Sequence, residues 1–517
     1  MLDARPPAPD AWLVVWRAYL RARLVSREVN LRLLAWIILG AYLLTLAAIV
    51  LYALHRGWLL YDYHRRDRSA CVLRTWYGRL PPVTVQLPIY NERYVVERLI
   101  DAVCALDYPR ELLEIQVLDD SDDETGRLAA RRIEFHAARG LRIEHLRRCE
   151  RAGYKAGALA HGLARAAGDF VLIFDADFVP EPATLRRLLP SFADPEVGMV
   201  QARWGHLNRD ASWLTRIQGL VLDGHFHIEH TARHAAGLFF NFNGTAGMWR
   251  VACLRDAGGW QADTLTEDLD LSYRAQMRGW RFVYRPDVLV AGELPTSVRA
   301  FKGQQARWAQ GSIQTARKLL PTLMRSSQPL RVKLEALAHL TSYVPAPLTL
   351  LLACLILPSA IYRMEWGGLL PPAIDLILLA LAVGPLALFY GAALRLGGRR
   401  AWPAILLYLP MVLALGIGIS VNNTRALLAG LADRRSAEFV RTPKRGSAAS
   451  GYRAGFSRWN ALAEGVLAAY VGVAIGYALT SGLYPSLPFL LLFLYGFTTV
   501  AAASLREPLA RGEISAV

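Results

Sequence analysis

The segment FVLIFDADF, residues 170–178, decides the fold of this chain. It opens with five apolar residues in a row, which is typical of a strand buried on both faces of a parallel sheet. Asp175 and Asp177 follow at once, at the strand end where such sheets bind ligands. Because unpaired buried charge is costly, the two carboxylates predict a bound divalent cation, Mg²⁺ or Mn²⁺. Solvated aspartates in a turn are the alternative for a lone Asp-x-Asp.

Short apolar and β-branched runs around this segment predict further strands, at residues 83–87, 115–118, 141–146 and 199–202. Helical patterns alternate with these runs, at residues 94–105, 124–139, 155–167 and 181–193. The alternation predicts an α/β doubly wound domain with an open, parallel sheet.

Long apolar runs lie on both sides of this domain. Each is long enough to cross a hydrocarbon core of about 30 Å. They occupy residues 34–54, 336–362, 369–394, 402–421, 462–482 and 484–504. The stretch from 70 to 300 holds none. With 54% hydrophobic content over 517 residues, the composition indicates a polytopic membrane protein.

The net charge of +16 reflects arginines that crowd the flanks of the apolar runs, a pattern typical of cytoplasmic loops. Because no basic stripe is interleaved with aromatic residues, we expect no nucleic-acid partner. The five cysteines are scattered without a CxxC pair, so neither a disulfide framework nor a zinc site is indicated. No cleavable signal peptide is expected.

Polar residues also follow the other predicted strands. Asn91 and Glu92 come after the first strand, and Asp119 and Asp120 come after the second. A carboxylate there could accept a hydrogen bond from a nucleobase imide, and capping of the next helix is the alternative. Lys155 lies at a glycine-flanked helix start, where its ammonium group and the helix dipole both favour a phosphate.

The loop NFNGTAG, residues 241–247, is too rich in glycine and polar residues to belong to the core. Asn243, Gly244 and Thr245 could let the backbone approach a sugar closely, and an ordinary tight turn is the alternative. Nearby, His225, His227 and His230 resemble metal ligands by spacing. We do not expect a zinc site there, because no cysteine or HExxH pattern accompanies them.

The segment Thr266-Glu267-Asp268 supplies the candidate base. A sugar hydroxyl that attacks an anomeric carbon must lose its proton, and the Asp268 carboxylate could accept it. Helix capping by Thr266 is the alternative.

Gln304, Arg307 and Trp308 share one face of a predicted helix. The guanidinium could clamp a departing diphosphate, and the indole offers a platform for a sugar ring. Simple amphipathicity of the helix is the competing explanation.

The chain resembles the family 2 inverting glycosyltransferases, above all the processive polysaccharide synthases, which include cellulose synthase and the plant cellulose-synthase-like mannan and glucan synthases. The resemblance covers roughly residues 80 to 450. It rests on the ordered motifs LPIYNE, VLDDS, GYKAGAL, FDADF, VQARW, FNGTAG, TEDLDLSYRA, GELP and QQARW. It implies a GT-A-type cytosolic domain inserted between α-helical transmembrane regions.

The motifs and the resemblance together predict roles for individual residues. Donor binding is expected from Asn91, Glu92, Asp119, Asp120, Lys155, Asp175, Gln304 and Arg307. Acceptor binding is expected from Trp308, Asn243, Gly244, Thr245 and Glu267. Asp175 and Asp177 would hold the metal, and Asp268 would be the catalytic base. FVRTPKRG, residues 439–446, is similar to the FxVTxK gating loop of cellulose synthases, which adds Thr442 and Lys444 to the donor site.

The charge rule for loops predicts the membrane topology. Residues 402–431 are expected to form one interfacial helix, because a crossing there would place the arginine-rich loop after it outside. Residues 298–325 should also lie on the inner surface. At the N-terminus, either residues 11–30 are embedded or the charge rule fails. The expected divisions are 1–69, 70–297, 298–335, 336–431, 432–459 and 460–517.

These patterns favour a membrane-embedded β-glycosyltransferase of the bacterial inner membrane, with its catalytic domain in the cytosol. It would polymerise sugar from UDP-glucose or GDP-mannose into a β-linked polysaccharide and translocate it. The expected partners are the nucleotide-sugar donor, a growing glycan or lipid acceptor, membrane lipids and accessory export subunits. One alternative is single transfer to a lipid, as in ceramide glucosyltransferase. A non-enzymatic nucleotide-sugar-binding export scaffold is the other.

Overall fold

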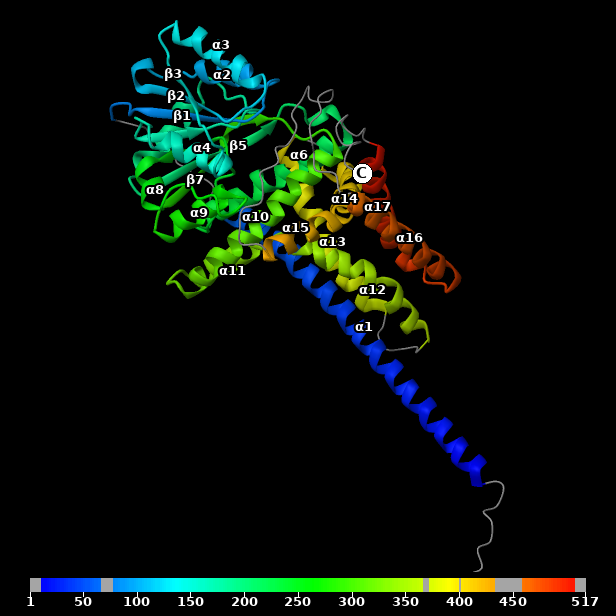
Figure 1. The fold of residues 1–517 in the computed structure, drawn as a ribbon. Helices are drawn as coiled ribbons and strands as arrows, with labels where there is room; N and C mark the ends of the chain where they lie inside the picture. Colours follow the sequence, from blue (N-terminus) through cyan, green and yellow to red (C-terminus); the bar gives the residue numbers. More distant parts are fainter. Residues whose placement is uncertain (1–10, 67–77, 366–371, 399–400, 433–457, 507–517) are drawn as a thin grey trace, which may run out of the picture.

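The computed structural model describes residues 11–66, 78–365, 372–398, 401–432 and 458–506. The chain forms an α/β domain joined to a bundle of long apolar helices, and α1, Ala11–Arg65, extends far beyond the other helices (Figure 1). The expected fold class, an α/β sheet domain placed between apolar helices, is confirmed.

A seven-stranded sheet in the order β3-β2-β1-β4-β6-β5-β7 forms the centre of the α/β domain. Its strands are β1 (Val83–Ile89), β2 (Leu113–Asp119), β3 (Arg142–Arg147), β4 (Phe170–Ile173), β5 (Val197–His206), β6 (Gly247–Arg250) and β7 (Arg281–Gly292). The first four strands are parallel, whereas β6 runs antiparallel to both of its neighbours. All five strands expected from the sequence are present, and β6 and β7 were not expected.

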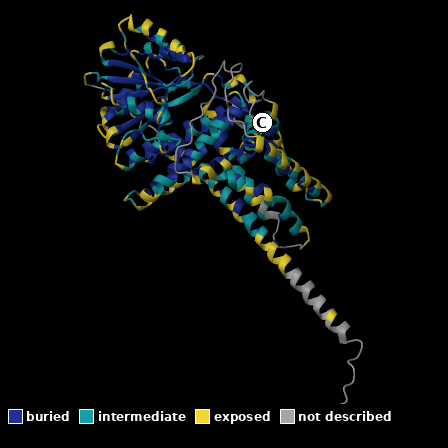
Figure 2. Ribbon diagram, viewed as in Figure 1, coloured by how far each residue is buried: buried dark blue, intermediate teal, exposed yellow. Residues whose placement is uncertain are grey.

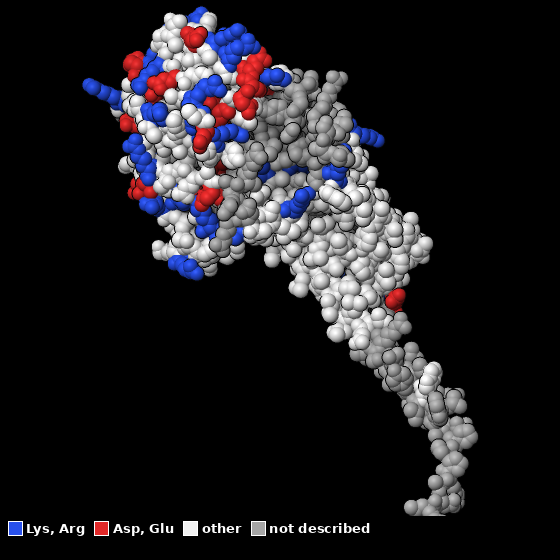
Figure 3. All heavy atoms as spheres, viewed as in Figure 1, with Lys and Arg blue, Asp and Glu red and all other residues white. Residues whose placement is uncertain are grey.

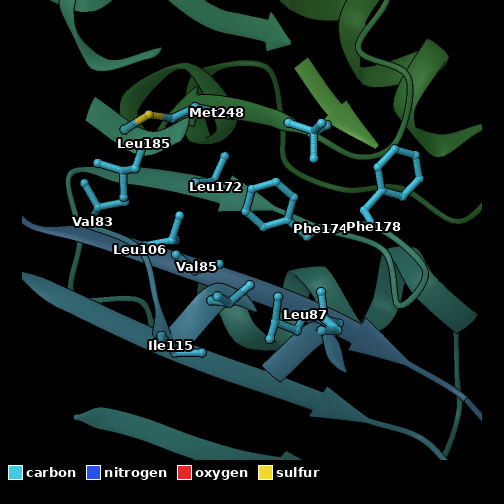
Figure 4. Packing of buried hydrophobic residues seen from close by; sticks show 14 of the residues in the cluster. Val83, Val85, Leu87, Leu106, Ile115, Leu172, Phe174, Phe178, Leu185 and Met248 are labelled. Carbon is cyan, nitrogen blue, oxygen red and sulfur yellow. The ribbon is translucent and has the colours of Figure 1, made fainter. Parts of the chain in front are cut away.

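The apolar runs of the strands form a core on both faces of the sheet. Val85, Leu87 and Leu172 are fully buried and pack against Leu185 and Met248 (Figure 4). Full burial of each such side chain contributes roughly 1.5–3 kcal/mol. The buried residues concentrate in this domain (Figure 2). Packing on both faces of the sheet holds the carboxyl ends of the parallel strands β1, β2 and β4 at one edge.

Short helices cover the sheet and carry the loops at that edge. They are α2 (Val96–Cys104), α3 (Thr125–Ala137), α4 (Tyr154–Leu163), α5 (Thr184–Leu188), α6 (Trp213–Asp223), α7 (Thr231–Ala235), α8 (Val251–Asp256) and α9 (Glu267–Met277). A π-helical turn, Gly224–His230, joins α6 to α7. π-helical turns often occur at functional sites, and this one faces the membrane helices.

The remaining helices connect the domain to the apolar bundle. They are α10 (Val298–Arg325), α11 (Leu330–Leu340), α12 (Pro345–Glu365), α13 (Pro372–Leu396), α14 (Ala401–Gly418), α15 (Ser420–Ala432), α16 (Arg458–Thr480) and α17 (Leu487–Arg506). Among the described residues, five helices are long and apolar enough to cross a membrane, at Asn30–Arg65, Pro345–Glu365, Leu376–Leu396, Arg458–Thr480 and Tyr484–Arg506. The charged side chains visible in Figure 3 lie mainly on the α/β domain, and the bundle is largely free of them on that face.

The prediction of a single helix over residues 402–431 is wrong. Two helices, α14 and α15, meet there at a bend of 48°. α14 packs closely on α17, since a Cβ added at Gly496 would lie 2.5 Å from the carbonyl oxygen of Ala414. α15 instead lies along α10, where Asn422 Nδ2 donates to the carbonyl of Lys302 at 2.9 Å. The two halves therefore contact different helices.

At the N-terminus, residues 11–30 continue the same helix as the apolar run that follows, so α1 is a single rod of 55 residues. The position of residues 11–30 relative to a bilayer stays a prediction.

A buried ion pair ties α10 to the bundle. Lys302 Nζ of α10 lies 2.6 Å from Glu464 Oε1 of α16 and 3.3 Å from the hydroxyl of Ser504 in α17. Charges buried among apolar helices are costly unless they are paired, and this pair satisfies that need. The helix that carries Gln304, Arg307 and Trp308 is therefore anchored to the bundle.

Candidate active site

A cavity of about 770 Å³ lies at the edge where the strands end. The residues expected to act on substrate that line it are Glu92, Asp120, Lys155, Asp175, Asp177, Asn243, Gly244, Glu267, Asp268, Gln304, Arg307 and Trp308. The same cavity is lined farther on by apolar side chains of α1, α12 and α17. Residues far apart in sequence thus converge on one space that joins the sheet to the membrane bundle.

Lys155, at the start of α4, connects two parts of the site. Its ammonium group donates to Asp175 Oδ1 at 2.6 Å and to the carbonyl oxygen of Gly244 at 2.9 Å. Burial acts to lower the pKa of Lys155, but the carboxylates of Asp175, Glu267 and Asp268 outweigh it and raise this pKa. The lysine is therefore held as a cation beside the carboxylates.

Asp268 lies in the first turn of α9, where its Oδ1 accepts a hydrogen bond from the Leu269 amide at 2.8 Å. Burial, followed by the neighbouring Glu267 carboxylate, raises the pKa of Asp268 to about 7, although Lys155 opposes the shift. Burial likewise raises the pKa of Glu267. A carboxylate with a pKa near neutrality is well matched to accepting a proton from a hydroxyl.

Gly244 approaches this carboxylate closely. Its φ is +80°, and an added Cβ would lie 2.9 Å from Asp268 Oδ2 and 3.4 Å from Lys155 Nζ. Only glycine has neither the backbone strain nor the crowding at this position. The loop therefore brings its backbone close to the Asp268 carboxylate, which favours the close-approach interpretation over an ordinary tight turn.

Asn243 lines the cavity beside Gly244, and two histidines hold its amide. His230 Nε2 lies 2.6 Å from Asn243 Oδ1, and Asn243 Nδ2 lies 3.1 Å from His225 Nε2. His227 is directed elsewhere, with Nε2 3.3 Å from an Arg203 guanidinium nitrogen. Within the described residues, no group of three or more histidine, cysteine or acidic side chains is arranged to hold a metal. His225 and His230 hold the Asn243 amide of the loop, a contact that their spacing did not reveal.

Three of the expected site residues that the structure describes do not line the cavity. Thr245 is fully buried, and its hydroxyl accepts a hydrogen bond from the Asp175 amide at 2.8 Å. Asn91, at φ 57°, donates its backbone amide to Ser121 Oγ at 2.9 Å. Thr245 thus fixes Asp175, which lines the cavity, whereas the partners of Asn91, Ser121 and Asp122, do not line it.

Asp119 is the third of these residues. It is 1% exposed, and its carboxylate is bound by His145 Nε2 at 2.9 Å and by the Ser121 amide at 2.9 Å. Burial acts to raise the pKa of Asp119, but these hydrogen bonds outweigh it and lower this pKa. Asp120 lines the cavity instead, with Oδ1 2.9 Å from Arg148 Nε. Of the two carboxylates, only Asp120 lines the cavity, where Arg148 binds both of its oxygens, and neither carboxylate caps α3.

The Gln304, Arg307 and Trp308 side of the cavity is positioned by close packing of α10 on α9. A Cβ added at Gly311 would lie 2.5 Å from Thr266 Cγ2. Thr266 is the N-cap residue of α9, as the capping alternative has it, but its side chain makes no capping hydrogen bond. Burial lowers the pKa of Arg307 to about 10. All three side chains face the shared cavity, which amphipathicity alone does not require.

Asp175 and Asp177 fit a divalent cation held jointly with a substrate. Asp175 reaches the cavity, and Asp177 is 2% exposed with Oδ2 3.2 Å from the amide of Glu293. Mg²⁺ is commonly held by one or two carboxylates together with substrate phosphates, so a larger cluster of protein ligands is not needed. Thr442 and Lys444, the expected gating residues, lie outside the described part of the chain.

The fold and the site define a membrane-associated protein with a GT-A-type domain. The chain belongs to glycosyltransferase family 2. The sequence profile described as "Glycosyltransferase like family 2" matches residues 81–311. A relative from Oryza sativa subsp. japonica, glucomannan 4-beta-mannosyltransferase 1, is 38% identical over 384 residues, which cover 71% of this chain and 70% of the relative.

Two further similarities support this assignment. Glucomannan 4-beta-mannosyltransferase 2 from Arabidopsis thaliana is 40% identical over 315 residues, 58% of this chain. The chain spans about three fifths of that relative, 59% of its length. In fold, the domain resembles mannosyltransferase PcManGT from Pyrobaculum calidifontis, solved in complex with GDP-Man and Mn²⁺, with a TM-score of 0.53 and 24% identity over 76% of this chain and 99% of that one.

The apolar helices indicate a membrane protein, as expected. Both sequence relatives come from plants, so they do not support the expected bacterial inner membrane.

Proposed function

We propose that the protein is a membrane-embedded inverting β-mannosyltransferase that uses GDP-mannose to extend a β-linked polysaccharide. The observation that carries this proposal is the single cavity, which joins the carboxylates of Asp175 and Asp268 to the interior of the helical bundle. GDP-mannose is favoured over UDP-glucose because the relatives are named as mannosyltransferases.

In this proposal each side chain acts on one part of the reaction. Asp268 accepts the proton of the acceptor hydroxyl as that oxygen attacks the anomeric carbon from the face opposite the diphosphate, which inverts the configuration. Lys155 and Arg307 bind the diphosphate, and Asp120 faces the nucleoside. A divalent cation at Asp175 and Asp177 would supply charge neutralisation of the diphosphate when bound.

The product would leave along the membrane side of the cavity. Leu46 of α1, Leu352 of α12 and Phe493 of α17 line that side. A polymer that grows at Asp268 would enter this space directly, which supports translocation. The α/β domain would face the compartment that holds the nucleotide sugar.

The test is to incubate the purified full-length protein, in lipid nanodiscs, with radiolabelled GDP-mannose or UDP-glucose. The expected result is a polymer from GDP-mannose that a β-1,4-mannanase degrades, and no polymer from the Asp268→Asn variant. Transfer of one sugar to co-purified lipid would instead establish the single-transfer alternative. Donor binding without any nucleotide release would establish the binding scaffold.

A further inference from the structure

A cluster of charged and histidine side chains surrounds the cavity where it passes from the α/β domain to the membrane helices. We call it the collar, and it consists of His55 and Arg56 of α1, His225 and Glu229 of the π-helical turn, Arg233 of α7 and Glu335 of α11. All of these except Glu335 line the cavity. The collar joins four elements that are far apart in sequence.

The collar residues are paired with one another in a continuous chain. Glu229 Oε2 lies 3.0 Å from His225 Nδ1 and 3.4 Å from Arg233 Nη1. Arg233 Nε reaches Glu335 Oε1 at 2.8 Å, and Glu335 Oε2 reaches His55 Nε2 at 2.8 Å. Two arginines and two glutamates balance, so the collar has no net charge when its histidines are neutral.

Stability alone does not explain such a cluster. Desolvation of buried ion pairs offsets most of their attraction, and apolar residues of similar size are often as stable. Ionisable side chains at membrane depth commonly mark the path of a polar substrate. Arg56 lies within the apolar span Asn30–Arg65, and its side chain is 32% exposed. The side chain of His225 is 23% exposed. The exposed parts of both face the cavity.

The chemistry of the collar selects the kind of ligand. A balanced set of donors and acceptors suits a neutral molecule with many hydroxyl groups, whereas a phosphate would require excess positive charge. Arg56 also lies beside aromatic rings, with Cζ 5.3 Å from the Phe389 ring centroid and Nη1 3.1 Å from the Tyr390 hydroxyl. Guanidinium and aromatic groups together match the polar edges and apolar faces of a sugar ring.

The collar also lies next to the candidate base. His225 holds Asn243 at 3.1 Å, and the following residue, Gly244, is the one whose added Cβ would lie 2.9 Å from Asp268 Oδ2. On the other side, the face of α1 that carries Arg56 continues along the cavity with Tyr52 and Ile49 at helical spacing. The collar therefore stands between the reacting hydroxyl and the membrane path.

We propose that the collar is a saccharide subsite that binds the second sugar of the acceptor chain, with Arg56 as its main contact. This proposal rests on the proposed function, since it assumes that the terminal sugar lies at Asp268. It assigns substrate recognition to α1, a helix outside the residues matched by the family profile.

The test compares acceptors of one and two sugars in the full-length protein in nanodiscs, with GDP-mannose as donor and either mannose or β-1,4-mannobiose as acceptor. The variants are Arg56→Gln, which removes the guanidinium, and Arg56→Lys, which keeps a charge beside Glu229. Arg65→Gln, on the exposed end of the same helix, is the matched control. Donor hydrolysis without acceptor reports on the donor site separately.

The wild type and Arg65→Gln should prefer mannobiose. In Arg56→Gln the KM for mannobiose should rise about tenfold, as expected for one lost charged hydrogen bond. Its KM for mannose and its rate of donor hydrolysis should change less than about twofold, and Arg56→Lys should be intermediate. An unchanged KM for mannobiose, or a parallel loss with mannose or in hydrolysis, would overturn the subsite.

Failure of the proposed function would be distinguishable. If the wild type neither hydrolyses nor transfers GDP-mannose, the donor assignment is wrong, whereas the collar can still be tested by calorimetric titration with β-1,4-mannobiose. Binding that weakens in Arg56→Gln and not in Arg65→Gln would support the subsite. Equal binding of mannobiose by Arg56→Gln and Arg65→Gln, or no binding by the wild type, would exclude the subsite for this saccharide class.

Discussion

The ammonium group of Lys155 lies 2.6 Å from Oδ1 of Asp175, the first carboxylate after strand β4. The same ammonium group donates to the Gly244 carbonyl oxygen at 2.9 Å, so one side chain joins the carboxylate edge of the sheet to the loop beside Asp268. Without a cation or a donor, Lys155 neutralises Asp175. A bound diphosphate would compete for the same ammonium group.

This relationship predicts that Lys155→Met weakens donor use. The loss of a charged hydrogen bond to the diphosphate should cost about 1.5–3 kcal/mol, which corresponds to roughly a tenfold to hundredfold fall in kcat/KM for the donor. Lys155→Arg should recover only part of the loss, because the guanidinium fork does not fit a site built for a compact ammonium group. Steady-state kinetics with varied GDP-mannose checks this, and a wild-type value in Lys155→Met would contradict it.

Asp268→Asn should abolish transfer and leave donor binding intact. Loss of a general base typically costs 10²–10⁴-fold in rate. Since burial raises the pKa of Asp268, a neutral amide is tolerated there, and we expect a melting temperature equal to or above that of the wild type. Equilibrium binding of labelled donor and a thermal melt check the two parts. A variant that loses donor binding would show that Asp268 is not the base alone.

The pH dependence follows from the same residue. The rate should rise as pH increases through about 7, because the base must be deprotonated. The contribution of Asp268 to the free energy of unfolding changes with pH in the opposite direction. Because the pKa of Asp268 is higher in the folded protein than in the unfolded chain, this contribution is complete below the unfolded pKa and is lost as pH rises to about 7. Melting curves from pH 4 to 8 should show a smaller loss in Asp268→Asn than in the wild type, because Glu267, whose pKa burial also raises, remains in the variant.

Gly244→Ala should inactivate the protein at a modest cost in stability. A Cβ at φ +80° is strained by about 1–2 kcal/mol, and it would also press on the Asp268 carboxylate. Gly259→Ala is the matched control, because Gly259 has φ +66° and an added Cβ there has nothing within 4 Å. Both variants should melt at similarly reduced temperatures, and only Gly244→Ala should lose transfer activity. Equal activity in the two variants would exclude the crowding of Asp268.

Removal of divalent cations should prevent donor binding. Asp175 and Asp177 alone would repel the diphosphate, and Lys155 neutralises only one of them. Titration of labelled GDP-mannose into protein treated with EDTA should show little binding, restored by Mn²⁺ or Mg²⁺. The neutral variant Asp177→Asn should lose the metal dependence together with activity. Full binding in EDTA would contradict a cation at these residues.

The sequence predicted the parts of the fold that depend on local pattern. Apolar runs such as residues 170–173 are strands, and the acidic residues after them line one cavity. Strands β6 and β7 were missed because β6 is four residues long within a glycine-rich region, and because β7 contains Pro286 and Asp287, which are unusual in strands.

The choice between Asp119 and Asp120 could not be made from sequence. It depends on the pairing of β2 with β3, which places Asp119 opposite Arg147 and beside His145. The collar was also invisible, since Arg56, Glu229 and Glu335 meet only in the folded chain and the π-helical turn has no local sequence signal. The bend between α14 and α15 likewise depends on which helices each half contacts.

The pairing of Lys302 in α10 with Glu464 in α16 has a mechanical consequence. The helix that carries Arg307 and Trp308 is thereby coupled to α16, which is long and apolar enough to cross a membrane. A movement of α16 would therefore be passed to one wall of the cavity, through this ion pair and through the hydrogen bonds that join Lys302 to Ser504 and to Asn422.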